Sequence, residues 1–446
     1  MLRITNSLTG QKEPFKPVFS GEVNLYVCGI TPYDFSHIGH GRCYVVFDMI
    51  YRYLSFLGYQ VKYCRNFTDI DDKLIMKAEK EFNDASRYQE IAHRYIDAYH
   101  EDMKSLNCLS PDKEPRVTQT IPQIIEFVEG LIANGSAYEL EGSVYFRVRL
   151  FNGYGKLSKQ DINDLRAGAR IDVDDKKEDP LDFALWKADV PSVSFQSPWG
   201  FGRPGWHIEC SAMAHDYFKG TVDIHGGGMD LLFPHHENEI AQSESLYPAP
   251  FVNYWMHNAF VRINKEKMSK SLNNFFTLKD ILKDFDPMVL RFYFLKHHYR
   301  GPLDFSFEDL QVAEKTYKRL VHFFADVESF PKSLLFAEAK NIAVVQAMSD
   351  CLADDFNTSG LFGVLFESLD NLQADNEEKA QVKSFITNIL GLTLAPIAEK
   401  IIEITPEIQT LIDARLQART DKNWQLADEI REQLKNLGFE VQDKKL

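Results

Sequence analysis

At 446 residues the chain is too long for one ordinary domain, so we expect roughly two to four domains. Its content of 44% hydrophobic and 26% charged residues is typical of a soluble globular protein, and no apolar run is long enough to cross a bilayer. We therefore expect a cytoplasmic protein with no membrane partner. The net charge of −15 argues against a nucleic-acid partner without excluding one, because binding depends on local basic patches.

The first predicted unit, residues 23–58, is a strand, a turn and a helix. An apolar, partly β-branched run over 23–27 predicts a buried strand, and an apolar-periodic helix then runs to a stop at Gly58. This order places Cys28 at the end of the strand, and His37 and His40 at a helix N-terminus. In an open α/β sheet ligands bind at that edge, and helix N-termini favour anions. The alternative is an ordinary turn with two surface histidines.

A second strand over 59–64 is expected to run parallel to the first. The acidic turn that follows, 66–73, either caps the next helix or faces the amine of a ligand. Helical patterns continue to about Leu109. Residues 110–197 then change character, with one helix, a hairpin-like stretch over 138–148 and a charged run. We interpret them as an insertion that splits the α/β domain.

Strand and glycine signals resume at 205–210 and 222–230, where a strand running into three glycines suits close approach to a sugar or phosphate. A helix is predicted to open at 233–239 with Pro234 near its first position. A strand-like run over 255–262 leads to a polar stretch, 267–274, which reads first as a solvated loop. Amphipathic helices are then predicted near 307–330, 338–352, 359–374, 377–400, 408–419 and 424–437, with a terminal strand-like run at 439–441.

Two of these stretches carry a family resemblance when they are taken together. His37-Ile38-Gly39-His40 and Lys267-Met268-Ser269-Lys270-Ser271, some 230 residues apart, match the HIGH and KMSKS motifs of class I aminoacyl-tRNA synthetases letter for letter. Within that class the chain resembles the cysteinyl-tRNA synthetases over nearly its whole length. The stretches that match them are 28–34, 205–213, 233–239 and 354–358.

The resemblance implies one zinc ion per chain, with Cys28, Cys210, His235 and Glu239 as its ligands. The sequence supports this set on its own, though less sharply. His235 and Glu239 are four residues apart on a predicted helix and so share a face, and both cysteines are expected at the ends of α/β units. Thiolate, imidazole and carboxylate groups are ordinary zinc ligands. Spacing does not separate His235 from His236, which could equally lie behind the ligands or at the surface. The other cysteines are expected to be buried apolar filler: Cys43, Cys64, Cys108 and Cys351.

The resemblance also implies a nucleotide site for ATP with magnesium. His37 and His40 would contact the phosphates, and Lys270, with Lys267, would offset charge on the leaving pyrophosphate. Thr68 and His225 would line the pocket for the amino acid and adenylate. Trp206 would close that pocket or act as core filler. The remaining residues implied in nucleotide or substrate binding are Gly29, Thr31, Gly39, Gly227, Gly228 and Asp230.

The fold class implied is a Rossmann-type α/β catalytic domain with a parallel sheet, split as 1–109 and 198–305 around the insertion 110–197. A helical bundle that binds tRNA would follow at 306–400, and a small mixed α/β anticodon-binding domain at 401–446. Many members of the family continue into a short basic tail that contains tryptophan, whereas this sequence stops at Leu446. Trp424, Arg415 and Lys422 are therefore the candidate anticodon contacts.

The activity implied is that of a monomeric cysteine–tRNA ligase. It would form cysteinyl-adenylate from cysteine and ATP, and then pass the cysteinyl group to the terminal ribose of tRNA(Cys). One alternative is a ligase that joins cysteine to an aminosugar with the same core, against which the helical and terminal regions argue. The other is a non-catalytic, synthetase-like protein that binds RNA or senses cysteine. A protein of that kind should have lost residues of the two nucleotide-binding motifs, and here both motifs are intact.

Overall fold

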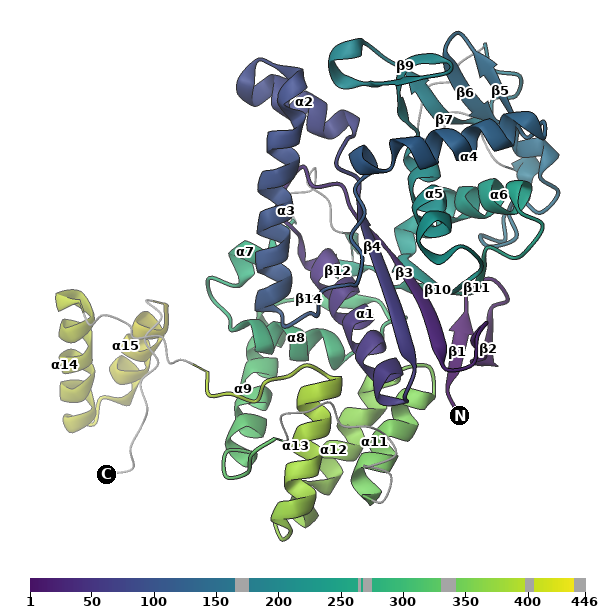
Figure 1. Ribbon diagram of the computed structural model, residues 1–446. Helices are drawn as coiled ribbons and strands as arrows, with labels where there is room; N and C mark the ends of the chain where they lie inside the picture. Colours follow the sequence, from purple (N-terminus) through teal and green to yellow (C-terminus); the bar gives the residue numbers. More distant parts are fainter. Residues whose placement is uncertain (165–175, 264–265, 268–274, 330–341, 398–404, 437–446) are drawn as a thin grey trace. The chain divides into compact units, whose positions relative to one another are not determined.

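The computed structural model describes residues 1–164, 176–263, 266–267, 275–329, 342–397 and 405–436 (Figure 1). It divides into two compact units, 1–395 and 396–446, each considered by itself. No helix among the described residues is long and apolar enough to cross a membrane. The predicted domain boundaries within the first unit stay predictions.

A four-stranded parallel sheet forms the centre of the first unit, in the order β11-β10-β3-β4. Its strands are β3 (Glu22–Ile30), β4 (Gln60–Phe67), β10 (Val222–Gly228) and β11 (Val252–Asn258). The chain first steps from β3 to β4 and later adds β10 on the other side of β3. The carboxyl ends of β3 and β10 therefore flank the point where strand order reverses, which is where ligands bind in open α/β sheets.

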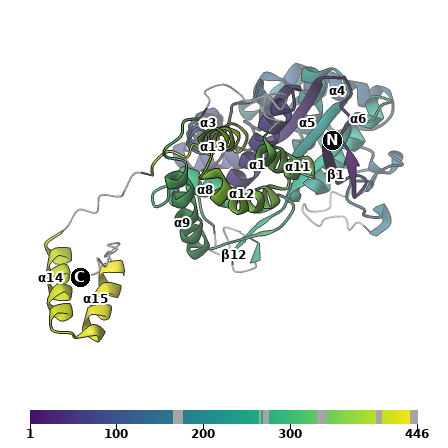
Figure 2. The ribbon, with the colours of Figure 1, turned by 90° about the horizontal axis from the view of Figure 1, so that it is seen from below.

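The opening strand and helix are as predicted. β3 is buried along nearly its whole length, as expected for a strand covered on both faces. The helix α1 (Ile38–Phe56) follows it, and β4 pairs with β3 in parallel. Helices α1 and α5 (Trp206–Phe218) both contact the sheet (Figure 2). The helices after β4, predicted to continue to about Leu109, are α2 (Asp72–Phe82) and α3 (Tyr88–Ser105).

The inserted segment forms a layer of its own above the sheet. The helix α4 (Ile121–Ala133) precedes a five-stranded antiparallel sheet in the order β5-β6-β7-β9-β8. Its strands are β5 (Ala137–Leu140), β6 (Ser143–Phe146), β7 (Phe183–Ala188), β8 (Phe195–Ser197) and β9 (Gly200–Pro204). The predicted hairpin is the pair β5–β6. The sequence predicts that the insertion ends at residue 197. Because β9 pairs with both β7 and β8, the sheet of the insertion continues past that residue.

Several local predictions differ from the structure. The stretch 205–210 lies at the start of α5, so Cys210 belongs to a helix and not to the end of a strand. By contrast, the predicted helix opening near Pro234 is present: Pro234 lies in the short π-helical segment Leu232–His236, which is kinked at Phe233 and leads directly into α6 (Glu237–Leu246). The strand-like run 255–262 is interrupted, since β11 ends at Asn258 and β12 (Val261–Ile263) begins a separate sheet.

That separate sheet has three strands in the order β13-β12-β14, with β13 at Glu266–Lys267 and β14 at Leu303–Phe305. The described residues between β13 and β14 include two short helices, α7 (Leu278–Ile281) and α8 (Pro287–Leu295). The N-terminal hairpin of β1 (Arg3–Asn6) and β2 (Gln11–Pro14) was not predicted. The rest of the KMSKS-like stretch, 268–274, lies outside the described residues.

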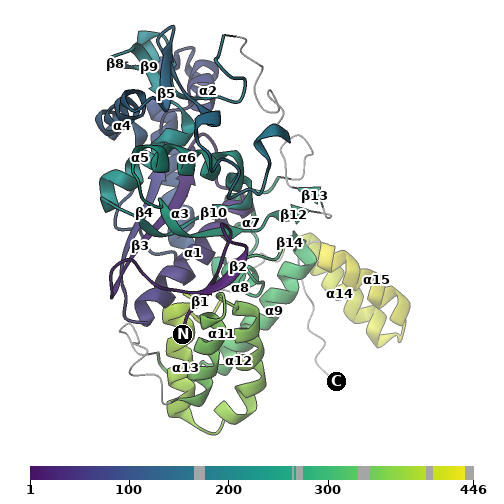
Figure 3. The same ribbon diagram turned by 90° about the vertical axis from the view of Figure 1, so that its right-hand side faces the viewer.

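The helices predicted after residue 304 are present, but the two predicted over 307–330 and 377–400 end earlier, at Phe323 and Ile389. Those of the first unit are α9 (Phe307–Phe323), α11 (Ala343–Ala353), α12 (Thr358–Leu372) and α13 (Asn376–Ile389), and they gather below the central sheet (Figure 3). The second unit contains α14 (Pro406–Thr420) and α15 (Trp424–Asn436), which pack through Ile408, Ile430 and Leu434. The strand-like run predicted at 439–441 lies outside the described residues.

Candidate functional site

Four side chains that were predicted as zinc ligands meet at the carboxyl end of β3. Cys28 comes from β3, Cys210 from α5, His235 from the turn before α6, and Glu239 from α6 itself. All four are buried, and their ligand atoms lie within 4.8 Å of one another. The two Sγ atoms are 3.8 Å apart, Cys28 Sγ lies 3.7 Å from Glu239 Oε1, and His235 Nε2 lies 3.1 Å from the same oxygen.

These distances fit a tetrahedral zinc ion. Zn–S bonds of about 2.3 Å at the tetrahedral angle place two sulfurs about 3.8 Å apart. The donor set of two thiols, an imidazole and a carboxylate is one that zinc takes. In addition, the second oxygen of Glu239, Oε2, is buried and accepts no hydrogen bond from any described residue, with His225 Nε2 at 3.5 Å as its nearest recorded polar contact. A buried acceptor left in this state favours a cation nearby.

A second set of candidate ligands overlaps the first. Cys28 and Glu239 also lie close to His225 and His236, whose Nε2 atoms are 3.4 and 3.3 Å from Cys28 Sγ. His236 is fully buried, so the alternative that places it at the surface is wrong. The geometry admits both ligand sets, and the choice of the set with Cys210 and His235 still rests on the family resemblance.

Each of the two adjacent histidines is oriented by a further ring. His235 Nδ1 lies 3.0 Å from His207 Nδ1, and His236 Nδ1 lies 2.8 Å from His257 Nε2. His257 in turn contacts the Ser7 hydroxyl at 2.8 Å. Such partners fix which ring nitrogen is free to bind a metal. Sequence reasoning missed His207 and His257, since their contacts join segments that are distant in the chain.

Burial sets the protonation of this cluster. It lowers the pKa of His225 and His236 well below the ordinary value, which keeps both rings neutral. It raises the pKa of the Cys28 thiol and of the Glu239 carboxyl. A hydrogen bond from the Cys28 thiol instead lowers the pKa of Cys210 to about 7. Cys210 is therefore the thiol that most readily becomes a thiolate, the form that binds metals.

Two other predicted pocket residues lie beside the cluster. The Trp206 ring lies over His235 at a centroid distance of 4.3 Å and is 38% exposed, so it is not core filler. The buried Thr68 hydroxyl donates to Glu209 Oε2 at 2.7 Å. Glu209 had not been predicted, because its partner lies 141 residues away and leaves no local signal.

The first synthetase-like motif forms the N-terminus of α1. His37 is the N-cap, and its Nδ1 accepts a hydrogen bond from the backbone N–H of His40 at 3.3 Å. The two imidazoles stack with centroids 3.6 Å apart, and burial lowers the pKa of His40 well below its ordinary value. A Cβ on Gly39 would lie 2.9 Å from the His37 ring, so this glycine makes room for that ring.

The residues that follow the second motif lie close to the first motif. Ile38 N–H donates to the carbonyl of Phe276 at 3.1 Å, and Leu278 N–H donates to that of Ser36 at 2.8 Å. The ring of Phe275 also contacts His37 at 5.4 Å. Lys267 lies on β13, and Lys270 lies outside the described residues. Residues 275–278 and the first motif are thus joined at one helix N-terminus.

Packing accounts for several of the predicted glycines. A Cβ on Gly29 would lie 1.5 Å from the Asn66 carbonyl oxygen, and one on Gly226 would meet the Phe47 ring at 2.1 Å. Gly227 similarly faces Leu231 and His236.

The acidic turn after β4 was predicted either to cap the next helix or to face a ligand amine. In the structure it caps the helix, because Asp71 is the N-cap of α2. The remaining predicted contacts are part-buried Thr31 and Gly228 and exposed Asp230.

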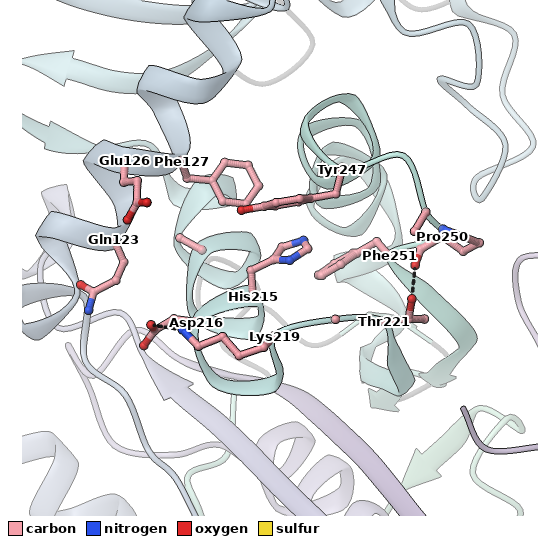
Figure 4. A pocket seen from close by; sticks show the side chains of 13 residues that line it. Gln123, Glu126, Phe127, His215, Asp216, Lys219, Thr221, Tyr247, Pro250 and Phe251 are labelled. Atoms are coloured by element: carbon pink, nitrogen blue, oxygen red, sulfur yellow. Dashed lines mark hydrogen bonds and ion pairs between the residues drawn. The ribbon is translucent and has the colours of Figure 1, made fainter. Parts of the chain in front are cut away.

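A separate hollow of about 450 Å³ lies between α4 and the C-terminal end of α5 (Figure 4). Phe127, His215, Tyr247 and Phe251 line it with their rings. Of the predicted site residues that the structure describes, none is in its wall.

The sequence matches known protein families over most of its length. A family model described as the class I (C) tRNA synthetase catalytic domain matches residues 14–315, and one described as the cysteinyl-tRNA ligase anticodon binding domain matches 403–446. Curated proteins named cysteine–tRNA ligase from Trichlorobacter lovleyi and Geobacillus sp. strain WCH70 are 46% and 47% identical to the chain. Each alignment covers 99% of this chain, and 98% and 97% of the respective relatives.

Among solved structures, methionyl-tRNA synthetase of Mycobacterium tuberculosis, in complex with methionyl-adenylate, resembles this chain with a TM-score of 0.58. The match covers 82% of this chain and 88% of the other at 14% identity. At that identity the likeness concerns the fold alone. Together with the catalytic-domain model, it confirms the predicted α/β fold class.

Proposed function

The chain belongs to the cysteine–tRNA ligase family of class I tRNA synthetases, and from this premise we propose how its two candidate sites divide the reaction. Its activity is the ATP-dependent ligation of cysteine to tRNA. The buried cluster beside β3 would hold zinc through Cys28, Cys210, His235 and Glu239. The α1 N-terminus would hold ATP. The single observation that carries the proposal is that four metal-ligand side chains converge, buried, at the strand-order reversal of the sheet.

A zinc ion bound there would act as a Lewis acid that binds the substrate sulfur as a thiolate and so distinguishes cysteine from serine. The protein's own part is to place the substrate. Trp206 would cover the outer side of the cluster, and Thr68 and His225 would line the pocket. Burial of the neutral His225 ring excludes water from the side facing β10.

In the first step the cysteine carboxylate attacks the α-phosphate of ATP, and pyrophosphate leaves. His37 and His40 would donate hydrogen bonds to the phosphates at the α1 N-terminus, where backbone N–H groups favour anions. His40 is neutral there and so acts as a donor without bringing charge. Lys267 and Lys270 would offset the charge of the departing pyrophosphate, as in the family motif. No side-chain nucleophile is needed, because positioning and electrostatics supply the catalysis.

In the second step a terminal ribose hydroxyl of tRNA(Cys) takes the cysteinyl group, and AMP leaves. The remaining substrate contacts carried over from the family are Gly29, Thr31, Gly39, Gly227, Gly228 and Asp230, with ATP taken as its magnesium complex. Trp424, Arg415 and Lys422 of the second unit are the proposed anticodon contacts. We place the reaction in the cytoplasm, with a monomer as the working form.

The decisive test is cysteine-dependent exchange of pyrophosphate into ATP, followed by transfer of cysteine to tRNA(Cys) or to an aminosugar acceptor. We expect exchange and transfer to tRNA only. The match of 403–446 to an anticodon-binding model supports tRNA as the acceptor. Transfer to the aminosugar would instead support the first alternative, and absence of exchange would support a non-catalytic protein.

A further inference from the structure

The corner between α11 and α12 contains the family-like stretch 354–358, to which neither candidate site gives a role. Asp355 and Phe356 have φ values of +63° and +53°, so two successive residues other than glycine adopt the left-handed conformation. This conformation costs free energy and persists only where surrounding contacts enforce it. Asp355 is also 1% exposed. A buried carboxylate on a backbone in this unfavourable conformation indicates that surrounding contacts hold Asp355 in place.

The carboxylate of Asp355 joins two segments distant in the chain. Its Oδ1 accepts from the backbone N–H of Thr5 and from the Tyr299 hydroxyl, both at 2.8 Å. Its Oδ2 accepts from the Thr5 hydroxyl at 2.7 Å and from Arg300 Nε at 2.8 Å. The corner therefore fastens strand β1 and the turn 298–301 to the helical bundle. Figure 3 shows β1 beside α11, and a backbone bridge pairs Arg3 with Asp354.

The same turn is held from the other side by α1. Arg42, fully buried and two residues after His40, donates to the carbonyls of His298 at 3.1 Å and Gly301 at 2.5 Å. Its other terminal nitrogen donates to the carbonyls of Ala259 at 3.0 Å and Phe260 at 3.2 Å. The turn 298–301 and the end of β11 are thus fixed relative to the helix that begins with the first motif.

From the turn, backbone pairing leads to the second motif. The turn runs into β14, which pairs in parallel with β12, and Arg262 of β12 pairs with Lys267 of β13. Leu303 N–H also donates to the Phe260 carbonyl at 3.0 Å. The turn therefore lies between α1, which carries His37 and His40, and the small sheet that carries Lys267.

We propose that Asp355 is a positioning residue of the nucleotide site, because it fixes the turn 298–301 and thereby the placement of the β12–β13 strands relative to α1. This inference rests on the proposed function, since it takes the two motifs as the ATP site. Loss of the carboxylate would take the shared acceptor from Arg300 and Tyr299, so that the turn, still held by Arg42 and by the contact of His298 Nε2 with the Asp355 carbonyl, could shift. A displacement of about 1 Å in a catalytic group is enough to slow a reaction strongly.

The test compares Asp355→Asn and the milder Tyr299→Phe with a matched control, Asp48→Asn. Asp48 is 2% exposed, accepts from Leu109 N–H at 2.7 Å and from Arg52 at 2.8 Å, and pairs with Arg291, yet it touches neither the turn nor the corner. In pyrophosphate exchange, we expect Asp355→Asn to raise the KM for ATP or lower kcat, so that kcat/KM for ATP falls about tenfold or more. Tyr299→Phe should cause a smaller fall in the same direction. The KM for cysteine should stay within about twofold in both variants.

The melting temperature separates positioning from general loss of structure. Asp48→Asn should lower it at least as much as Tyr299→Phe does, while its KM for ATP stays at the wild-type value. Equal losses for ATP and cysteine in the Asp355 and Tyr299 variants, or a loss for ATP in Asp48→Asn as large as theirs, would overturn the inference. If Asp355→Asn does not fold, Tyr299→Phe alone decides. Failure of exchange in the wild-type enzyme would count against the proposed function instead.

Discussion

Cys28 and Cys210 face each other across 3.8 Å with almost no contact with water, and they contribute differently to the proposed metal site. The Cys28 thiol donates toward Cys210 and lowers the pKa of Cys210 to about 7, while burial raises the pKa of Cys28 itself. Glu239 and His235 complete the set from one helical turn. Removal of Cys210 takes away the thiol that loses its proton most easily.

Cys210→Ser is therefore expected to lose its metal. Elemental analysis of the purified wild-type protein should give about one zinc per chain, and the variant should retain under about a fifth of that. Cys43→Ser is the matched control, because Cys43 is buried on α1 and burial raises its pKa to about 12. That variant should keep its zinc. A zinc-free wild-type protein that activates cysteine at full rate would refute the metal site.

Asp102 makes stability depend on pH. It is 8% exposed, its Oδ2 has no hydrogen-bond partner among the described residues, and burial, reinforced by Glu101, raises its pKa to about 7. The folded state therefore holds this proton more tightly than the unfolded chain, whose carboxyl titrates near 3.9. The stabilisation is complete below that pH and is lost as the pH rises toward and past 7.

Asp102→Asn should consequently raise the free energy of unfolding at pH 8 by about 1–2 kcal/mol, and should have little effect near pH 4. Denaturant unfolding at both pH values measures this difference. Asp97→Asn, an exposed position on the same helix, is the control and should change neither value. A gain at pH 4 that equals the gain at pH 8 would show that protonation of Asp102 is not the cause.

At the scale of elements, the β3–α1–β4 unit could be predicted because its signals are local. The apolar run, the turn residues and the stop at Gly58 follow one another in sequence. The position of Cys210 within a helix could not be predicted from local signals, since it depends on the packing of α5 on the sheet. The bond from Thr68 to Glu209 and the ring pairs of His235 and His236 likewise depend on tertiary contacts. Resemblance to a family supplied the ligand set that spacing alone left open.

His40 at the α1 N-terminus should matter for the chemical step and not for holding cysteine. His40→Ala is expected to lower kcat for pyrophosphate exchange by roughly 10²-fold, because it removes a donor to charge that grows in the transition state. Cysteine affinity, measured by equilibrium binding, should stay within about twofold. His93→Ala, on the exposed face of α3, serves as the control. Unchanged exchange in His40→Ala would show that the motif is not the ATP site.

At the scale of the whole molecule, the two units have separate cores. The second unit packs through Ile408, Ile430 and Leu434, whereas the first unit is closed near its end by Leu394, whose N–H donates to the Tyr317 hydroxyl at 3.0 Å. A chain that ends after Ala395 keeps that closing contact. We expect it to retain pyrophosphate exchange within about threefold and to lose at least about tenfold in kcat/KM for charging tRNA(Cys). Equal loss of both activities would mean that residues 396–446 stabilise the first unit.

The layer formed by the insertion bears on how the enzyme rejects serine, because an inserted domain could hydrolyse tRNA that carries the wrong amino acid. Val144, Phe146 and Trp186 of its sheet belong to the same hydrophobic core as Cys28 and Cys210, so it packs as a part of the catalytic unit. We therefore do not expect it to act as a hydrolytic editing domain.

Discrimination against serine must then occur when the amino acid binds. An apolar pocket separates near-isosteres by only about 10²-fold, whereas a site built around one obligatory contact reaches on the order of 10⁴–10⁵. A thiol gives up its proton beside zinc far more readily than a hydroxyl does, so the proposed site supplies such a contact. The enzyme should activate serine only marginally and should leave serine-charged tRNA(Cys) unhydrolysed over many turnovers of the cysteine reaction. If it clears that mischarged tRNA rapidly, selection continues after binding, and the insertion becomes the first place to seek the second active site.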